Sequence, residues 1–195
     1  FLVQLALADI NVDPFLTDKY NIGDKVNIKG SVLFDEDVQG SMKIDLSCGE
    51  NNTLPVYFTL LDLVLETPQE YDIVVPMRES FVGKCSFIVT VEGIAENFQQ
   101  SSDIFEVTDE LNVDVSVDKL LANPGDMIII SGSAKKMNGE VIEDGNGILI
   151  IDGDSELVEL KDGVFEYPLQ LQSSIDSGKH DIEFSLQDDK GNKGE

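Results

Sequence analysis

One phrase in the first part of the chain returns about one hundred residues later, and this repeat constrains the fold more than any other feature. Each copy holds an Asx-rich start, an Asn-x-Gly-Asp segment and a Gly-Ser pair. The copies lie at 9–13, 21–24 and 30–31, and at 110–114, 123–126 and 132–133. A period this long fits a whole domain, because solenoid repeats have roughly 20 to 50 residues. The sequence therefore predicts two tandem domains, 9–108 and 109–195, preceded by an extra segment, 1–8.

The charge of the chain limits its partners. Thirty-eight acidic residues stand against thirteen basic ones, which gives a net charge of -25 spread along the length. Such a surface repels nucleic acid and anionic membranes, so we expect no nucleic-acid partner. No apolar run approaches the roughly 18 residues of a membrane span, and we expect no direct membrane insertion by this segment. The acidity fits a solvated surface, cation binding, a high-salt habitat or repulsion between filaments.

Short runs with period-2 alternation and β-branched residues recur along the chain, as is typical of β-strands. The expected strands of the first domain lie at 26–28, 42–46, 71–75, 87–91 and 104–107. Those of the second domain lie at 127–130, 148–151, 157–160, 165–169 and 181–186. Each Asn-x-Gly-Asp segment precedes a strand and predicts a turn, in which glycine takes positive φ and Asp bonds nearby backbone amides.

Seven or so short strands per hundred residues, with turn signals at intervals of about ten, favour an all-β fold: two tandem immunoglobulin-like antiparallel β-sandwich domains. The segments 123–126, 177–184 and 188–192 carry a resemblance to a known group. By them the chain resembles the tandem Ig-like β-sandwich repeats of bacterial and archaeal cell-surface or filament proteins. The resemblance implies an extracellular, cell-surface setting and no particular ligand.

The ends of the chain are out of phase with the two domains. In 1–8, the side chains of Phe1, Val3, Leu5 and Leu7 point to one side of an expected strand, at the place where 104–107 closes the first domain. The second domain is expected to lack its last strand, which would follow the turn at 188–192. Three accounts remain open. The chain is a piece of a longer array, its first strand is donated to a neighbouring copy, or 1–8 is the remainder of a secretory signal.

Two cysteines and one histidine are the chain's only residues of these types. Cys48 and Cys85 fall at the end and the start of expected strands, which favours a disulfide over two free buried thiols. When the neighbouring glycines of the two domains are aligned, Asp152 and His180 fall opposite the cysteine positions. We expect a polar pair there in place of the bridge. No nucleophile motif accompanies His180, so we expect no enzyme activity.

Acidic and Asn residues cluster at several turns. Ca²⁺ takes six to eight oxygen ligands from such groups, and the equivalent clusters at the start of each domain are the best candidates for stiffening a domain junction. These metal candidates are Asp9, Asn11, Asp13, Glu110, Asn112 and Asp114. Asx residues are also ordinary turn formers, which is the competing interpretation. No cofactor other than Ca²⁺ is indicated.

The sequon Asn51-Asn52-Thr53 follows an expected strand in a polar loop and makes Asn51 a glycosylation candidate if the protein is secreted.

These observations together favour a non-enzymatic extracellular structural protein, the repeat unit of a surface filament, stalk or layer. Its partners would be other copies of itself or adjoining Ig-like domains of a longer chain, with β-strand donation through Phe1, Val3, Leu5 and Leu7 as one assembly route. The alternative is an adhesin-type binding module that recognises a glycan or a protein through its loops.

Overall fold

The computed structural model describes residues 8–34, 38–49, 52–63, 67–92 and 97–195. It confirms the all-β prediction: the described residues form antiparallel sheets and a single 3-10 turn. The chain divides into two compact units, Phe1–Val107 (unit 1) and Thr108–Glu195 (unit 2).

The elements of unit 1 are β1 (Ala8–Val12), β2 (Lys19–Asn21), β3 (Lys25–Phe34), β4 (Val38–Cys48), β5 (Asn52–Leu63), β6 (Gln69–Pro76), η1 (Glu79–Phe81), β7 (Gly83–Glu92), β8 (Asn97–Ser101) and β9 (Phe105–Thr108), whose last residue belongs to unit 2. Those of unit 2 are β10 (Leu111–Val117), β11 (Met127–Lys136), β12 (Asp144–Ile151), β13 (Asp154–Lys161), β14 (Val164–Gln170), β15 (Ile182–Asp188) and β16 (Lys193–Gly194).

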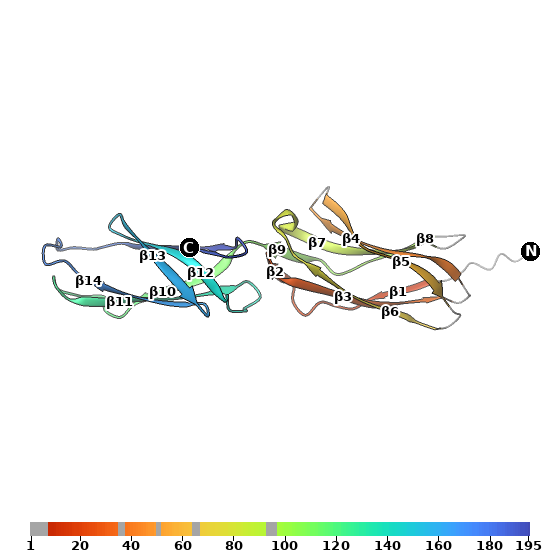
Figure 1. Cartoon of the computed structure of the whole chain (residues 1–195), viewed down its shortest axis with the longest axis horizontal. Coiled ribbons are helices and arrows are strands. Elements are labelled where there is room, and N and C mark those ends of the chain that lie inside the picture. Colours follow the sequence, from red (N-terminus) through yellow and green to blue (C-terminus); the bar gives the residue numbers. More distant parts are fainter. Residues whose placement is uncertain (1–7, 35–37, 50–51, 64–66, 93–96) are drawn as a thin grey trace, which may run out of the picture. The chain divides into compact units, whose positions relative to one another are not determined.

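Each unit has two layers of strands (Figure 1). In unit 1 one sheet has the order β1-β3-β6, and the other has the order β2-β9-β7-β4-β5, with β8 also paired to β7. In unit 2 the order is β10-β11-β14-β13-β12-β15-β16. Its two halves are joined through the β13–β14 hairpin by the single pair Lys161–Val164. The pairing β1-β3-β6 thus recurs as β10-β11-β14, and β5-β4-β7 recurs as β13-β12-β15.

The repeated Asn-x-Gly-Asp phrase forms the same turn in both units, as the sequence predicts. Gly23 and Gly125 have φ of 91° and 88°. The Asp24 carboxylate accepts the N–H of Asn21 at 2.7 Å, and Asp126 accepts that of Asn123 at 2.8 Å. A carboxylate that satisfies a turn amide fixes the entry into the next strand, β3 or β11.

The repeated Gly-Ser pair makes room for an aromatic ring. A Cβ atom on Gly30 would meet the carbonyl oxygen of Asn11 and the hydroxyl of Tyr71, and one on Gly132 would meet the ring of Phe165. Gly30 lies opposite Tyr71 in the β3–β6 ladder, and Gly132 lies opposite Phe165 in the β11–β14 ladder. Glycine is therefore required at this rung because the ring of the neighbouring strand covers it.

Equivalent rungs of the two units follow from the ends of the central ladders. Cys48 ends β4 opposite Cys85 of β7, and Ile151 ends β12 opposite Ile182 of β15. A residue with positive φ follows each of these strands. We call the Cys48–Cys85 and Ile151–Ile182 pairs the common rung and number equivalent positions from it.

Each unit buries its own hydrophobic cluster. The largest fully buried side chains include Phe34, Phe87 and Phe105 in unit 1, and Leu149 and Leu160 in unit 2. These residues alternate with less buried ones along their strands, which is the pattern of a strand with one face toward a core.

Candidate functional site

In unit 1, β9 closes the side of the core next to β7. Phe105 of β9 pairs with β7 at Cys85 and is 1% exposed. Its ring centroid lies 5.2 Å from that of Phe15, 5.6 Å from Tyr20 and 5.5 Å from Phe87. Four aromatic rings thus gather where β9 meets the core, and their burial makes this a large contribution to the stability of unit 1.

The described residues cover the corresponding side of unit 2 less completely. β15 pairs with β12 along its whole length, but on its other side only two described residues pair with β16. A groove of about 600 Å³ lies there. Its apolar lining includes Val113 and Val115 of β10 and Ile182 and Phe184 of β15, with Val115 41% exposed.

The register shows which strand of unit 1 has no counterpart here. Gln187 and Thr90 lie five residues beyond the common rung; Gln187 pairs with Lys193 of β16, and Thr90 pairs with Gln99 of β8. β16 therefore repeats β8. Among the described residues of unit 2, no strand occupies the place that β9 has in unit 1.

The aromatic residue two positions beyond the common rung has a different ring partner in each unit. In unit 1 it is Phe87, which stacks on Phe105 of β9 at 27° between ring planes. In unit 2 it is Phe184, which stacks on Phe165 with centroids 4.6 Å apart and 18° between planes. Among the described residues, β15 has no strand partner before Leu186 on the side away from β12, and apolar side chains line the groove beside it. An incoming β-strand pairs with such an edge and covers such side chains at the same time.

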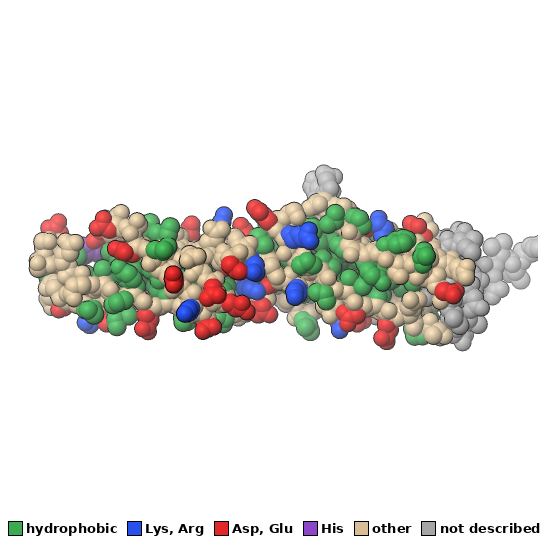
Figure 2. Space-filling view, in the orientation of Figure 1, with side chains coloured by type: hydrophobic (Ala, Val, Ile, Leu, Met, Phe, Trp, Pro, Cys, Tyr) green, Lys and Arg blue, Asp and Glu red, His purple; other side chains and the backbone are tan. Residues whose placement is uncertain are grey.

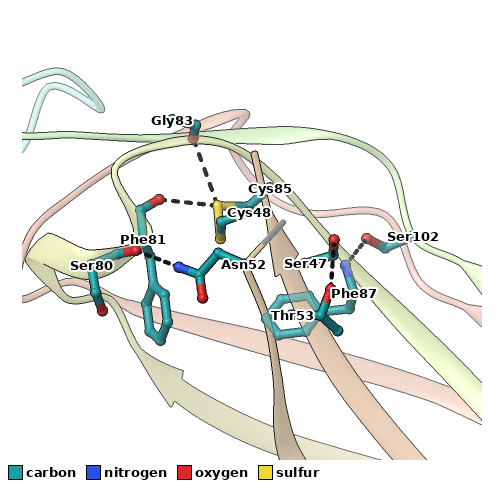
Figure 3. Close-up of a disulfide and its surroundings, with 10 residues drawn as sticks. All are labelled: Ser47, Cys48, Asn52, Thr53, Ser80, Phe81, Gly83, Cys85, Phe87 and Ser102. Atoms are coloured by element: carbon teal, nitrogen blue, oxygen red, sulfur yellow. Dashed lines mark hydrogen bonds between the residues drawn. A yellow bond between two sulfur atoms is a disulfide. The ribbon is translucent and has the colours of Figure 1, made fainter. Parts of the chain in front are cut away.

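A disulfide joins Cys48 and Cys85, the pairing that the sequence predicts (Figure 3). Both cysteines are buried in the core cluster of unit 1. The Sγ atom of Cys85 lies 3.2 Å from the carbonyl oxygen of Phe81. A disulfide sulfur carries no proton, so this is a packing contact. The bond covalently ties β4 to β7 at the common rung.

The glycosylation candidate Asn51 lies outside the described residues, but its neighbours do not form the loop that the sequence suggests. Asn52 begins β5, and its side-chain amide donates to the Ser80 carbonyl at 2.7 Å (Figure 3). The Thr53 hydroxyl donates to that of Ser47 at 3.3 Å.

His180 and Asp152 form the expected polar pair, with Nδ1 2.5 Å from a carboxylate oxygen of Asp152. The other ring nitrogen lies 3.0 Å from the carbonyl oxygen of Asp176. Hydrogen bonds to Asp152 and Asp176 raise the pKa of His180. The pair does not occupy the disulfide position: Ile151 and Ile182 are at the common rung, and Asp152 follows it in the turn. Both ring nitrogens have hydrogen-bond partners, as is typical of a histidine with a structural role.

The metal candidates lie on β1 and β10 and beside them. Asn11 donates its side-chain amide to Asp13 at 2.9 Å, and the Asn11 carbonyl accepts from the Tyr71 hydroxyl at 2.9 Å. Asp9 lies on β1, Asn112 and Asp114 lie on β10, and Glu110 directly precedes β10. Within the described ranges, no three His, Cys, Asp or Glu side chains gather as a metal site would require. Calcium binding stays a prediction.

The assembly residues Phe1, Val3, Leu5 and Leu7 lie outside the described residues. Comparison of the chain with protein-family models and with curated proteins gives no match. In the part of the chain that the structure describes, no helix has the length and apolar character needed to cross a membrane.

Proposed function

We propose that this chain is a non-enzymatic structural protein of the cell exterior, in which two tandem Ig-like β-sandwiches serve as a repeat unit of a surface filament, stalk or layer. The second sandwich is completed by a β-strand from residues Phe1–Leu7 of another copy. Because donor and acceptor are different parts of the chain, the contact is heterologous and copies join head to tail.

The open groove of unit 2 carries this proposal. β9 fills the corresponding place in unit 1 with a deeply buried phenylalanine, whereas Ile182 and Phe184 of unit 2 face a groove of about 600 Å³. An extended segment in that groove would add backbone hydrogen bonds to β15 and cover its apolar side chains.

The sequence of the first residues supports them as the donor strand. Leu5-Ala6-Leu7-Ala8-Asp9 has the alternation of Phe105-Glu106-Val107-Thr108-Asp109, and each segment directly precedes or enters the first strand of a unit. Leu5 and Leu7 would then take the places that Phe105 and Val107 have in unit 1. Unit 1 already holds its own β9, so its groove is not available to the donor.

The proposed setting is supported by the disulfide and by the charge. Disulfides persist in oxidising compartments such as the cell exterior. A net charge of -25 keeps neighbouring polymers apart and soluble, and it disfavours nucleic acid as a partner.

The test uses two variants of the 195-residue chain. Val3→Asp with Leu5→Asp removes the donor, and Val115→Asp charges the groove at a residue that is already partly exposed. The unmodified chain should form head-to-tail polymers, seen by electron microscopy and analytical ultracentrifugation. Neither variant should polymerise alone. Mixed together, they should form one-to-one complexes, because one working donor meets one working groove.

Circular dichroism and the integrity of the disulfide control for folding of both variants. An unmodified chain that stays monomeric at every concentration, or polymers of normal length from either variant, would rule out strand donation. Binding of glycans without polymerisation would favour the adhesin alternative.

A further inference from the structure

A second surface of interest lies on unit 1 and is separate from the groove of unit 2. β5 is the last strand of its sheet, and its outward face carries apolar side chains. Phe58 is 63% exposed and Leu60 76%. Figure 2 shows hydrophobic side chains at the surface of unit 1, over the region where Figure 1 places β4 and β5.

Most of this edge is also uncharged, because the one charged residue of β5 is Asp62, next to the end of the strand. Residues 51–61, between Glu50 and Asp62, are the longest run without a charged residue in a chain of net charge -25. Other strands at sheet edges carry charges within a few residues, such as Asp72 in β6 and Asp114 in β10. Natural proteins usually place charged side chains on edge strands to prevent pairing with another chain.

Unit 2 shows what a protected version of the same strand looks like. Phe58 pairs with Lys43, five residues before the common rung, and Glu159 of β13 pairs with Asn146 at that rung of unit 2. Two residues further on, Leu60 of β5 corresponds by the same count to Lys161 of β13. Glu and Lys in unit 2 thus stand where unit 1 exposes Phe and Leu.

We propose that β5 is a self-association surface, which pairs antiparallel with β5 of a second copy about a two-fold axis. A second copy is the occupant because of charge. At most surfaces two copies of so acidic a chain would repel each other, and like charges directly opposite destabilise a strand pair. The uncharged run of β5 meets itself without that penalty.

Two features locate the contact within β5. Pro55 has no N–H to donate, so the pairing falls on the residues after it, 56–61. In this stretch Phe58 and Leu60 alternate with more buried neighbours and lie on one face of the strand. Antiparallel pairing of two copies places these side chains together, where aromatic and aliphatic cross-strand contacts add to the backbone hydrogen bonds. This contact closes on itself, unlike the head-to-tail contact of the proposed polymer.

The experiment is done in the Val3→Asp/Leu5→Asp background, so that its outcome does not depend on strand donation. Sedimentation velocity over a concentration series should show a reversible dimer. Phe58→Glu with Leu60→Lys places in β5 the residues that unit 2 has at equivalent positions, and should give monomers at all concentrations. Leu157→Glu in β13, at a side chain that is 69% exposed, is the matched control and should leave the dimer intact.

Reverse substitution gives a second, independent readout. Glu159→Phe with Lys161→Leu makes β13 resemble β5 and, added to the Phe58→Glu/Leu60→Lys protein, should restore association. A monomer in the starting background overturns the proposal. A dimer that survives Phe58→Glu/Leu60→Lys in protein with an unchanged circular dichroism spectrum overturns it equally.

Discussion

At the common rung, unit 1 joins β4 to β7 through Cys48–Cys85, whereas unit 2 places Ile151 opposite Ile182 and adds the His180–Asp152 pair in the turn beyond. Above the repeated glycine, unit 1 has a tyrosine and unit 2 a phenylalanine. The strand ladders are alike, but the interactions that secure them differ in kind. The same ladder position thus holds a covalent bond in unit 1 and an apolar pair in unit 2, and the His180–Asp152 pair lies beyond it.

The largest expected effect is loss of the disulfide. The cysteines are 37 residues apart in sequence. On the loop-entropy model a bridge of this span contributes at most about 4 kcal/mol. Cys48→Ala with Cys85→Ala should therefore destabilise unit 1 by about 2–4 kcal/mol and leave unit 2 unchanged.

Urea denaturation monitored by hydrogen exchange and mass spectrometry measures the loss of unfolding free energy in each unit separately. Reduction of the disulfide in the unmodified protein should destabilise unit 1 in the same way. Equal destabilisation of both units would mean that they do not unfold separately, and the comparison between them would then fail.

An intermediate effect is expected at Tyr71. Its hydroxyl donates to the Asn11 carbonyl at 2.9 Å. Tyr71→Phe gives unit 1 the type of residue that unit 2 has at this rung and should cost unit 1 about 1 kcal/mol, the usual net value of one hydrogen bond. A cost of zero in urea denaturation would show that the two aromatic residues are interchangeable.

The same tyrosine gives unit 1 a dependence on alkaline pH. Burial, with a further contribution from the nearby Asp13 charge, raises the pKa of Tyr71 to about 12 from 10.0. The contribution of the protonated Tyr71 to the stability of unit 1 is therefore fully present below pH 10. It is lost as the pH rises toward 12, because the tyrosine ionises at lower pH in the unfolded chain than in the folded one. Tyr71→Phe should reduce this loss of stability at high pH. Part of the loss should remain in the variant, because the pKa of Tyr20 in unit 1 is also raised.

The smallest effect is expected at His180, because the pair is solvent-accessible. Its pKa is raised in the folded state by hydrogen bonds to Asp152 and the Asp176 carbonyl. The contribution of the pair is therefore fully present below pH 6.5 and decreases as the pH rises through the raised pKa. The melting temperature of unit 2 should fall over this window, and Asp152→Asn should flatten the fall.

Unit 1 is a built-in control for this titration, because His180 is the only histidine in the chain. A fall of the same size in both units would assign the pH dependence to another group.

Local patterns predicted much of the fold but missed several strands, namely β1, β2, β5, β8, β10 and β16. Alternation predicted β3, β4, β6, β7 and β9 in unit 1 and β11 to β15 in unit 2. β5 was missed, because the segment after Asn52 carries apolar residues on both faces and contains Pro55, so it has neither clear alternation nor an uninterrupted run. A search for long uncharged segments would have found it.

The candidate site also has features that the sequence predicted and features that it did not. The disulfide was predictable, since only Cys48 and Cys85 are available and both lie at strand ends. The His180–Asp152 pair was also predictable, but its register was not: alignment of glycines placed it at the cysteine positions, and the ladder places it beyond them. An incomplete second domain was expected from the sequence, but the equivalence of β16 with β8 was not, because two residues carry no pattern from which to decide it.

By itself, the sequence determined the all-β class, the repeat and the Asn-x-Gly-Asp turns, because alternation, glycine φ and Asx hydrogen bonds act within a few residues. Only the tertiary structure decided why Gly30 must be glycine, which edge of unit 1 is left apolar and which strand of unit 1 β16 repeats. These features depend on contacts between strands far apart in sequence, such as Gly30 with Tyr71, and on a register in which a shift of one residue turns every side chain to the other face.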